Sequence, residues 1–195
     1  MYIFRLLYNN YWMFINMIKR SYIYIIVQVA LYISLLVISS LIAIPLPFSL
    51  GAITLQTIII NILSANLKPK YATLVVLSYI LLGLVGLPVF AGGTSGIGKI
   101  LSPIGGYYLG FILSSFVMSV ILKKNLTFKK LLIVYIFVGT LIIHICAISW
   151  MMFYNNFNLL NALLTVSIPF ILTDIIKCVI SALVAYKLQN TSLKN

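Results

Sequence analysis

The run Ser167-Ile-Pro-Phe-Ile-Leu-Thr-Asp-Ile-Ile-Lys177 places a carboxylate and an ammonium group inside an apolar C-terminal segment. Asp174 is the only acidic residue among 195. An aspartate or lysine at the centre of a membrane helix costs about 2.5–3.5 kcal/mol, so such residues usually pair, face the bundle interior and mark a substrate path. Positions i and i+3 share one face of a helix. Asp174 and Lys177 can therefore present an acceptor and a donor to one small polar ligand.

The composition of the whole chain is that of an all-α polytopic membrane protein. It is 63% hydrophobic and 7% charged, with a mean hydropathy of +1.18. Its apolar stretches repeatedly reach the length of about 20 residues that spans a bilayer. The formal net charge of +12 would suggest nucleic acid as the partner of a soluble chain. Because the basic residues stand at the ends of apolar segments, we interpret them as topology signals and expect the lipid bilayer, not nucleic acid, around the protein.

Six membrane-spanning helices fit a single domain over residues 21–190. We expect them at 22–44, 53–66, 71–87, 103–122, 131–153 and 163–188, with a glycine-rich loop over 91–102. The second segment has 14 residues. It is either a short tilted helix or a helix that does not fully cross the membrane.

The basic residues orient this six-helix bundle with both termini in the cytoplasm. Lys99 stands alone on the opposite side, and Lys177 lies within a span. Cytoplasmic loops carry the excess of lysine and arginine, so the glycine-rich loop is expected on the outer side. The residues on the cytoplasmic side are Arg5, Lys19, Arg20, Lys68, Lys70, Lys123, Lys124, Lys129, Lys130, Lys187 and Lys194.

Two terminal segments are expected outside the bundle. Residues 1–20 are rich in aromatic residues but are broken by Arg5 and three asparagines. They are either an interfacial helix or an over-long start, with Met13 or Met17 as the first residue. They do not resemble a cleavable signal, because basic residues flank both ends and no small-residue cleavage site follows. Residues 191–195 form a short C-terminal tail.

The chain has little material for catalysis, so we expect no enzyme, no metal site and no cofactor. The run Gly93 to Lys99 matches a phosphate-binding P-loop, but Ile100 stands where a Ser or Thr must hold magnesium. His144, Cys146 and Cys178 have no metal-ligand spacing. We interpret His144 as a hydrogen-bonding residue in helix packing and the two cysteines as small apolar residues.

Small residues mark one face of the first expected helix. Ala30 and Ser34 are four residues apart, as are Ser39 and Ala43. Such spacing lets another helix approach closely, because lipid provides no hydrophobic drive for helix association. Packing within the bundle explains this pattern as well as a partner protein does.

Four motifs follow one another along the chain. They are Ile44-Pro-Leu-Pro-Phe-Ser-Leu-Gly-Ala-Ile-Thr-Leu-Gln56, Leu82-Gly-Leu-Val-Gly-Leu-Pro-Val-Phe-Ala-Gly-Gly93, Ser102-Pro-Ile-Gly-Gly-Tyr-Tyr-Leu-Gly-Phe111 and Ile168-Pro-Phe-Ile-Leu-Thr-Asp-Ile-Ile-Lys177. In this order they resemble the BioY family, the biotin-specific S components of energy-coupling factor transporters. The last motif is similar to that family's Pro-Phe-x-x-x-Asp-x-x-Lys signature. The resemblance covers approximately residues 30–186.

The resemblance implies a biotin-binding protein in the cell membrane of a prokaryote. It places the ligand near the outer surface, enclosed by the loops after helices one, three and five. An ionised Asp174 can accept the ureido N–H groups, and Lys177 can donate to a ligand oxygen. Ile53 and Leu55 would serve as apolar walls. The expected substrate-binding residues are Phe90, Gly92, Gly93, Thr94, Ser95, Gly96, Tyr107, Asp174 and Lys177.

The resemblance also implies partners. S components dock onto a transmembrane coupling subunit that carries two ATPases, and Ala30 and Ser34 match the family's docking face. The chain departs from the family pattern at Ser102 and Ile104, where the family usually has Gly and Thr, and at Thr94, where it often has Asn or another polar residue. Two alternatives remain open: an S component for thiamine or riboflavin, and a channel or structural helical bundle without a small-molecule site.

Overall fold

The computed structural model describes the backbone of residues 2–47, 49–122 and 126–192, and the side chains of 22–47, 49–122 and 126–190. The expectations placed on Lys123, Lys124, Lys194 and the side chains of the first 21 residues therefore lie outside the described residues. The orientation of the bundle and the interfacial role of residues 1–20 stay predictions.

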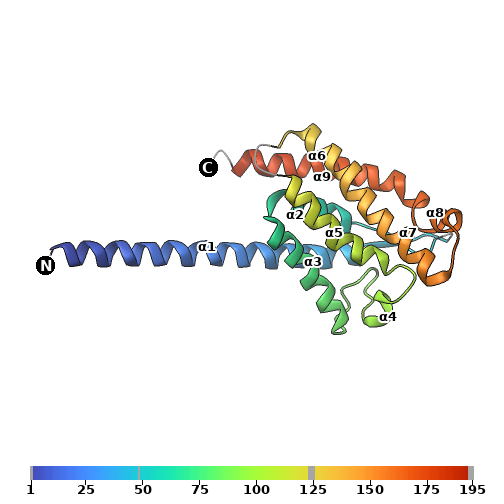
Figure 1. The fold of residues 1–195 in the computed structure, drawn as a ribbon, viewed down its shortest axis with the longest axis horizontal. Helices are drawn as coiled ribbons and strands as arrows, with labels where there is room; N and C mark the ends of the chain where they lie inside the picture. The colour runs from blue at the N-terminus through green and yellow to red at the C-terminus, as the bar shows by residue number, and fades with distance from the viewer. Residues whose placement is uncertain (1, 48, 123–125, 193–195) are drawn as a thin grey trace.

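Helices make up most of the described chain (Figure 1). One antiparallel hairpin follows the first helix and pairs Ile44 with Ile53. In Figure 1 both termini lie toward one side of the bundle, and α4 and α8 lie toward the other. The elements are α1 (Tyr2–Leu41), β1 (Ala43–Pro45), β2 (Ala52–Thr54), α2 (Gln56–Asn66), α3 (Pro69–Leu84), α4 (Ile97–Ile100), α5 (Gly106–Ile121), α6 (Phe128–Val134), η1 (Tyr135–Thr140), α7 (Leu141–Asn155), α8 (Leu159–Val166) and α9 (Ile168–Ser192).

Three helical stretches of the described chain are long and apolar enough to cross a membrane: Tyr22–Leu41, Phe128–Asn155 and Ile168–Asn190. Helices α3 and α5 are shorter apolar helices. The protein is therefore a helical membrane protein, and the count of six crossings stays a prediction.

The first span ends earlier than expected. It was predicted to reach Ile44, but α1 ends at Leu41 and Ile44 lies in β1. Pro45 explains the difference, because a proline disfavours the helical conformation of the residue before it and cannot donate a backbone hydrogen bond. The extended segment pairs with β2 and begins a loop that returns over the bundle.

The sixth span is interrupted. It was predicted to run from Leu163, but residues 159–166 form the separate helix α8 and α9 begins at Ile168. A proline inside a helix clashes with the carbonyl four residues earlier, which for Pro169 is that of Thr165. The break at Ser167 removes this clash. The freed carbonyl of Thr165 accepts a hydrogen bond from Ser49 Oγ at 2.6 Å, and that of Val166 accepts one from the Tyr107 hydroxyl.

The fifth span is continuous but changes its winding. A π-helical turn, η1, separates α6 from α7, and Thr140 Oγ1 donates to the carbonyl of Tyr135 at 3.0 Å. Such turns insert an additional residue and are often found at functional sites. This turn shifts the helical phase of α7 relative to α6, and α7 carries Ile143, which lines the cavity described below.

Glycines bring α5 and α7 into close contact. A Cβ added at Gly106 would lie 2.5 Å from the carbonyl oxygen of Cys146, and one at Gly110 would lie 2.8 Å from the Cα of Ile143. Both obstacles are backbone atoms of α7, which cannot rotate away. Close packing of this kind holds membrane helices together where lipid provides no hydrophobic drive.

We expect Gly106→Ala to lower the free energy of unfolding by about 1–3 kcal/mol, because overpacking forces α5 away from α7. Thermal unfolding in mild detergent measures the effect. Gly98→Ala is the matched control, since a Cβ at Gly98 meets nothing within 4 Å. Equal melting temperatures of the two variants would contradict this account of the α5–α7 contact.

Candidate ligand-binding site

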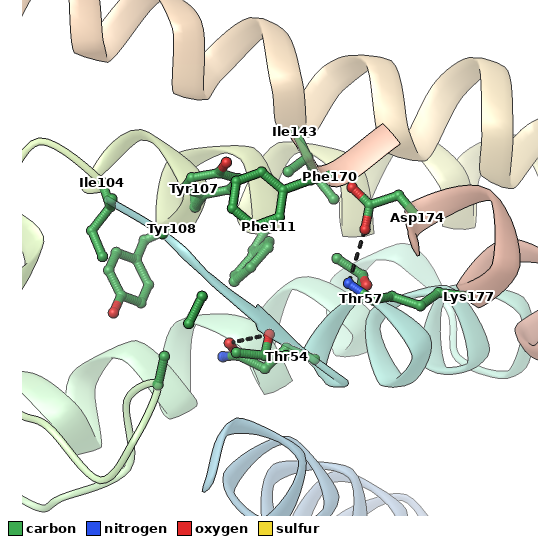
Figure 2. Close-up of a pocket in the computed structure, with 14 residues that line it drawn as sticks. Thr54, Thr57, Ile104, Tyr107, Tyr108, Phe111, Ile143, Phe170, Asp174 and Lys177 are labelled. Carbon is green, nitrogen blue, oxygen red and sulfur yellow. Dashed lines mark hydrogen bonds and ion pairs between the residues drawn. The ribbon is translucent and has the colours of Figure 1, made fainter. Parts of the chain in front are cut away.

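A cavity lies between α2, α5, α7 and α9 and is covered by the β1–β2 hairpin (Figure 2). Polar groups of α2 and α9 and aromatic rings of α5 and α9 supply most of its surface. Its lining residues are Gly51, Ala52, Thr54, Gln56, Thr57, Ala91, Ile104, Tyr107, Tyr108, Phe111, Ile143, Phe170, Asp174 and Lys177.

The charged centre of the site is the Asp174 carboxylate. Its Oδ1 accepts a hydrogen bond from Lys177 Nζ at 2.9 Å, and its Oδ2 lies 3.1 Å from His144 Nε2. The three residues are 8%, 7% and 5% exposed. An ionised carboxylate only accepts hydrogen bonds, so we assign the imidazole proton to Nε2. Each carboxylate oxygen thus has its own donor, one from α9 and one from α7.

A second polar group lies at the hairpin side of the cavity. Gln56 accepts a hydrogen bond from Thr54 Oγ1 at 3.0 Å and donates one to the Tyr79 hydroxyl at 2.7 Å, which fixes the orientation of its amide. The Tyr79 hydroxyl donates in turn to the carbonyl of Val89 at 2.9 Å. Thr57 also lines the cavity, and its buried hydroxyl has no hydrogen-bond partner among the described residues. It is therefore available to a ligand.

Aromatic rings form the wall between these polar groups. Tyr107 and Phe170 meet edge to face, with ring centroids 6.2 Å apart. The hydroxyl of Tyr107 is held by the carbonyl of Val166, so its ring, rather than its hydroxyl, is presented to the cavity. Figure 2 shows Asp174 and Lys177 toward one end of the cavity and Tyr108 toward the other. The site combines one charged end with an apolar body.

Three of the residues predicted from the sequence meet in this cavity: Tyr107, Asp174 and Lys177. Phe90 does not line it. Its side chain is fully buried, and its ring packs against Tyr108 with the centroids 4.7 Å apart. It belongs to the layer of the core behind the cavity. Ile53 and Leu55 are also absent from the lining, since the inward positions of this segment are taken by Thr54 and Gln56.

The predicted glycine-rich loop lies next to the cavity and touches it only through Ala91. Phe90 N donates to the carbonyl of Thr94 at 2.8 Å, which closes a tight turn. Gly92 and Gly93 within it have φ of 70° and 74°, a left-handed backbone that favours glycine. The turn shape accounts for these glycines. The roles of Gly92, Gly93, Thr94, Ser95 and Gly96 as direct ligand contacts stay predictions.

Several residues of the cavity, and His144 beside it, have no site role in the sequence analysis. His144 was interpreted as a hydrogen-bonding residue in helix packing, and its partner proves to be Asp174 on the neighbouring helix. Gln56 and Phe170 stand inside the quoted motifs without an assigned role. Thr57 follows Gln56 directly. Two neighbouring polar residues at the start of an apolar helix are the sequence feature that could have indicated a role for Gln56 and Thr57 in the cavity.

A bundle of apolar helices around a partly open cavity with a buried ion pair defines the class of the protein: a helical membrane protein with a candidate small-molecule site. In the described part of the chain, no three His, Cys, Asp or Glu side chains stand together as metal ligands. The model of the BioY family matches residues 15–194, so the chain belongs to the BioY family.

Relatives of known name cover nearly the whole chain. The biotin transporter BioY of Thermotoga maritima is 33% identical over 87% of this chain and 98% of its own length. The probable biotin transporter BioY of Rickettsia prowazekii is 32% identical over 98% of this chain and 96% of its own length. The crystal structure of the S component for biotin from an ECF-type ABC transporter superposes with a TM-score of 0.80, at 27% identity, over 88% of this chain and 93% of that one.

We expect Lys177→Met to lower the free energy of unfolding by about 3 kcal/mol, because it removes one partner of a buried carboxylate. The additional change Asp174→Asn removes the unpaired charge and should restore much of the lost stability. Lys130→Met is the control, since that lysine is exposed. Thermal unfolding in detergent compares the variants, and a double variant less stable than Lys177→Met would contradict the role of the ion pair.

Proposed function

We propose that this chain is the biotin-binding S component of an energy-coupling factor transporter and mediates biotin uptake across the plasma membrane of a prokaryote. The observation that carries the proposal is the buried Asp174–Lys177 pair, which faces an aromatic cavity in a chain of the BioY family. The names of the relatives and of the superposed crystal structure support the choice of biotin.

The chemistry of the cavity suits biotin. The ureido ring of biotin carries two N–H donors and a carbonyl acceptor. Asp174 supplies a carboxylate that accepts from N–H groups, and Lys177 supplies donors for an oxygen. The unpartnered hydroxyl of Thr57 can donate or accept. The rings of Tyr107 and Phe170 provide the apolar surface that a fused ring and an aliphatic tail require.

The residue types available in the chain favour ligand binding over catalysis. With one carboxylate in the chain, there is no second acid to act as a partner in general acid–base catalysis. We therefore propose a protein without a cofactor or metal, whose transport is energised by a transmembrane coupling subunit and two ATPases. We further propose six membrane crossings with both termini in the cytoplasm, supported by the positions of the basic residues.

Equilibrium binding of labelled biotin to the purified chain in mild detergent tests the proposed ligand. We expect saturable binding that thiamine and riboflavin do not displace. Asp174→Asn should weaken it by about ten- to a hundredfold or more, because hydrogen bonds to a charged group are lost. Thr57→Val, which removes only the free hydroxyl, should weaken it less.

Two results would contradict the biotin proposal, and a third would contradict the role of Asp174. Displacement by thiamine or riboflavin would indicate another vitamin. Absence of saturable binding by a chain that melts cooperatively would indicate a structural bundle or channel. Unchanged affinity in Asp174→Asn, with an unchanged melting temperature, would remove Asp174 from the ligand site.

A second experiment tests the proposed docking face. Ala30 and Ser34 are exposed on consecutive turns of α1, and Ser34 Oγ donates to the carbonyl of Ala30 at 3.0 Å. We expect the double change Ala30→Leu and Ser34→Leu to abolish co-purification with the coupling subunit and biotin uptake by cells, because bulky residues prevent close helix approach. Biotin binding in detergent should persist. Leu183→Phe adds bulk at an exposed position of α9 and is the control; loss of co-purification in both variants would contradict the assignment.

A further inference from the structure

His144 is the one member of the buried charged cluster that lies outside the cavity lining. Its Nε2 lies 3.1 Å from Asp174 Oδ2, whereas Lys177 occupies the other carboxylate oxygen and faces the cavity. His144 is 5% exposed, and its Nδ1 has no partner in the part of the chain that the structure describes. Among the described residues, the His144 side chain therefore bonds only the Asp174 carboxylate, and this bond connects α7 to α9.

Lys177 has two tasks that compete, because it is the only cation in the lining of the cavity. In the structure its ammonium pairs with Asp174 at 2.9 Å. In the proposed ligand complex the same ammonium donates to an oxygen of the ligand. Each step of Lys177 toward the ligand weakens its contact with Asp174. A buried carboxylate that loses its partner is strongly destabilised, so with Lys177 as its only protein donor Asp174 would depend on the ligand's own N–H groups while Lys177 moves.

We propose that His144 is a positioning residue that holds the Asp174 carboxylate from behind and thereby releases Lys177 to the ligand. The inference rests on the proposed function, since it concerns how the same cavity accepts biotin. His144 remains bonded to Oδ2 while Lys177 turns, so Asp174 keeps one donor throughout.

A neutral histidine suits this task better than a second cation. The Asp174–Lys177 pair has no net charge, and a neutral imidazole adds a donor without adding a third charge to a membrane interior, where unpaired charges are costly. The hydrogen bond also fixes the carboxylate relative to α7. Helix α7 is in turn held against α5 at Gly106 and Gly110, and α5 carries Tyr107 of the aromatic wall. The position of the Asp174 carboxylate relative to the aromatic wall is thus fixed.

Two substitutions at His144 separate positioning from packing. His144→Gln keeps an amide N–H at about the reach of Nε2, whereas His144→Leu keeps the bulk and removes the donor. We expect His144→Leu to weaken biotin binding by about ten- to a hundredfold and His144→Gln to bind nearly as wild type. Tyr135→Phe is the control, because it removes a buried unpartnered hydroxyl of the same span outside the cavity; its affinity should not change.

A cycle in the ligand-free protein tests the same idea without biotin. If His144 and Lys177 substitute for each other as partners of Asp174, the double variant His144→Leu with Lys177→Met should lose more thermal stability than the sum of the single variants.

The outcomes distinguish the two proposals. Wild-type affinity in His144→Leu, or equal losses in His144→Leu and His144→Gln, would overturn the positioning role while leaving biotin binding intact. Additive losses of stability in the cycle would overturn it as well. The wild-type chain could fail to bind biotin while the double variant still loses more stability than the sum of the single variants. That result would overturn the proposed ligand and retain His144 and Lys177 as joint partners of Asp174.

Discussion

The hydrogen-bonded pair of Asp174 and Lys177 is the constraint around which the rest of the site is arranged. One carboxylate can remain ionised inside an apolar bundle when donors occupy its oxygens. One donor comes from the next turn of its own helix and the other from His144 on α7. The hydrogen bond from His144 links α7 to α9 at this point, and the glycines of α5 bring the aromatic wall against α7.

Buried backbone carbonyls need hydrogen-bond donors as well. A bilayer offers no water to unpaired carbonyls, so irregular segments at membrane depth must be bonded within the protein. The break before α9 frees the carbonyls of Thr165 and Val166, and side chains from the hairpin and α5 bond them both. The break before Pro169 therefore leaves two carbonyls that bond Ser49 of the hairpin, which covers the cavity, and Tyr107 of its aromatic wall.

Much of the fold and the centre of the site could be predicted from local pattern. Apolar stretches of membrane length indicated the long helices, and the i, i+3 spacing of Asp174 and Lys177 indicated a shared face. The order of four motifs indicated the family. Sequence pattern does not separate a glycine needed for a left-handed turn from one needed for access to a ligand, so the glycines in the loop after α3 stay predicted ligand contacts. Phe90 was placed in the wall for its apolar character, which a core position equally demands.

The sequence by itself determined the membrane class of the protein, the solitude of its one carboxylate and the lysine one turn away, because composition and spacing within a helix are local properties. Tertiary structure alone decided that His144 meets Asp174, that Gln56 and Thr57 face the cavity and that Phe90 lies behind it. Each of these depends on the rotation and packing of one helix against another, which the π-turn before α7 and the break before α9 alter. The spacing of residues along one helix carries no information about how the neighbouring helix is rotated about its axis.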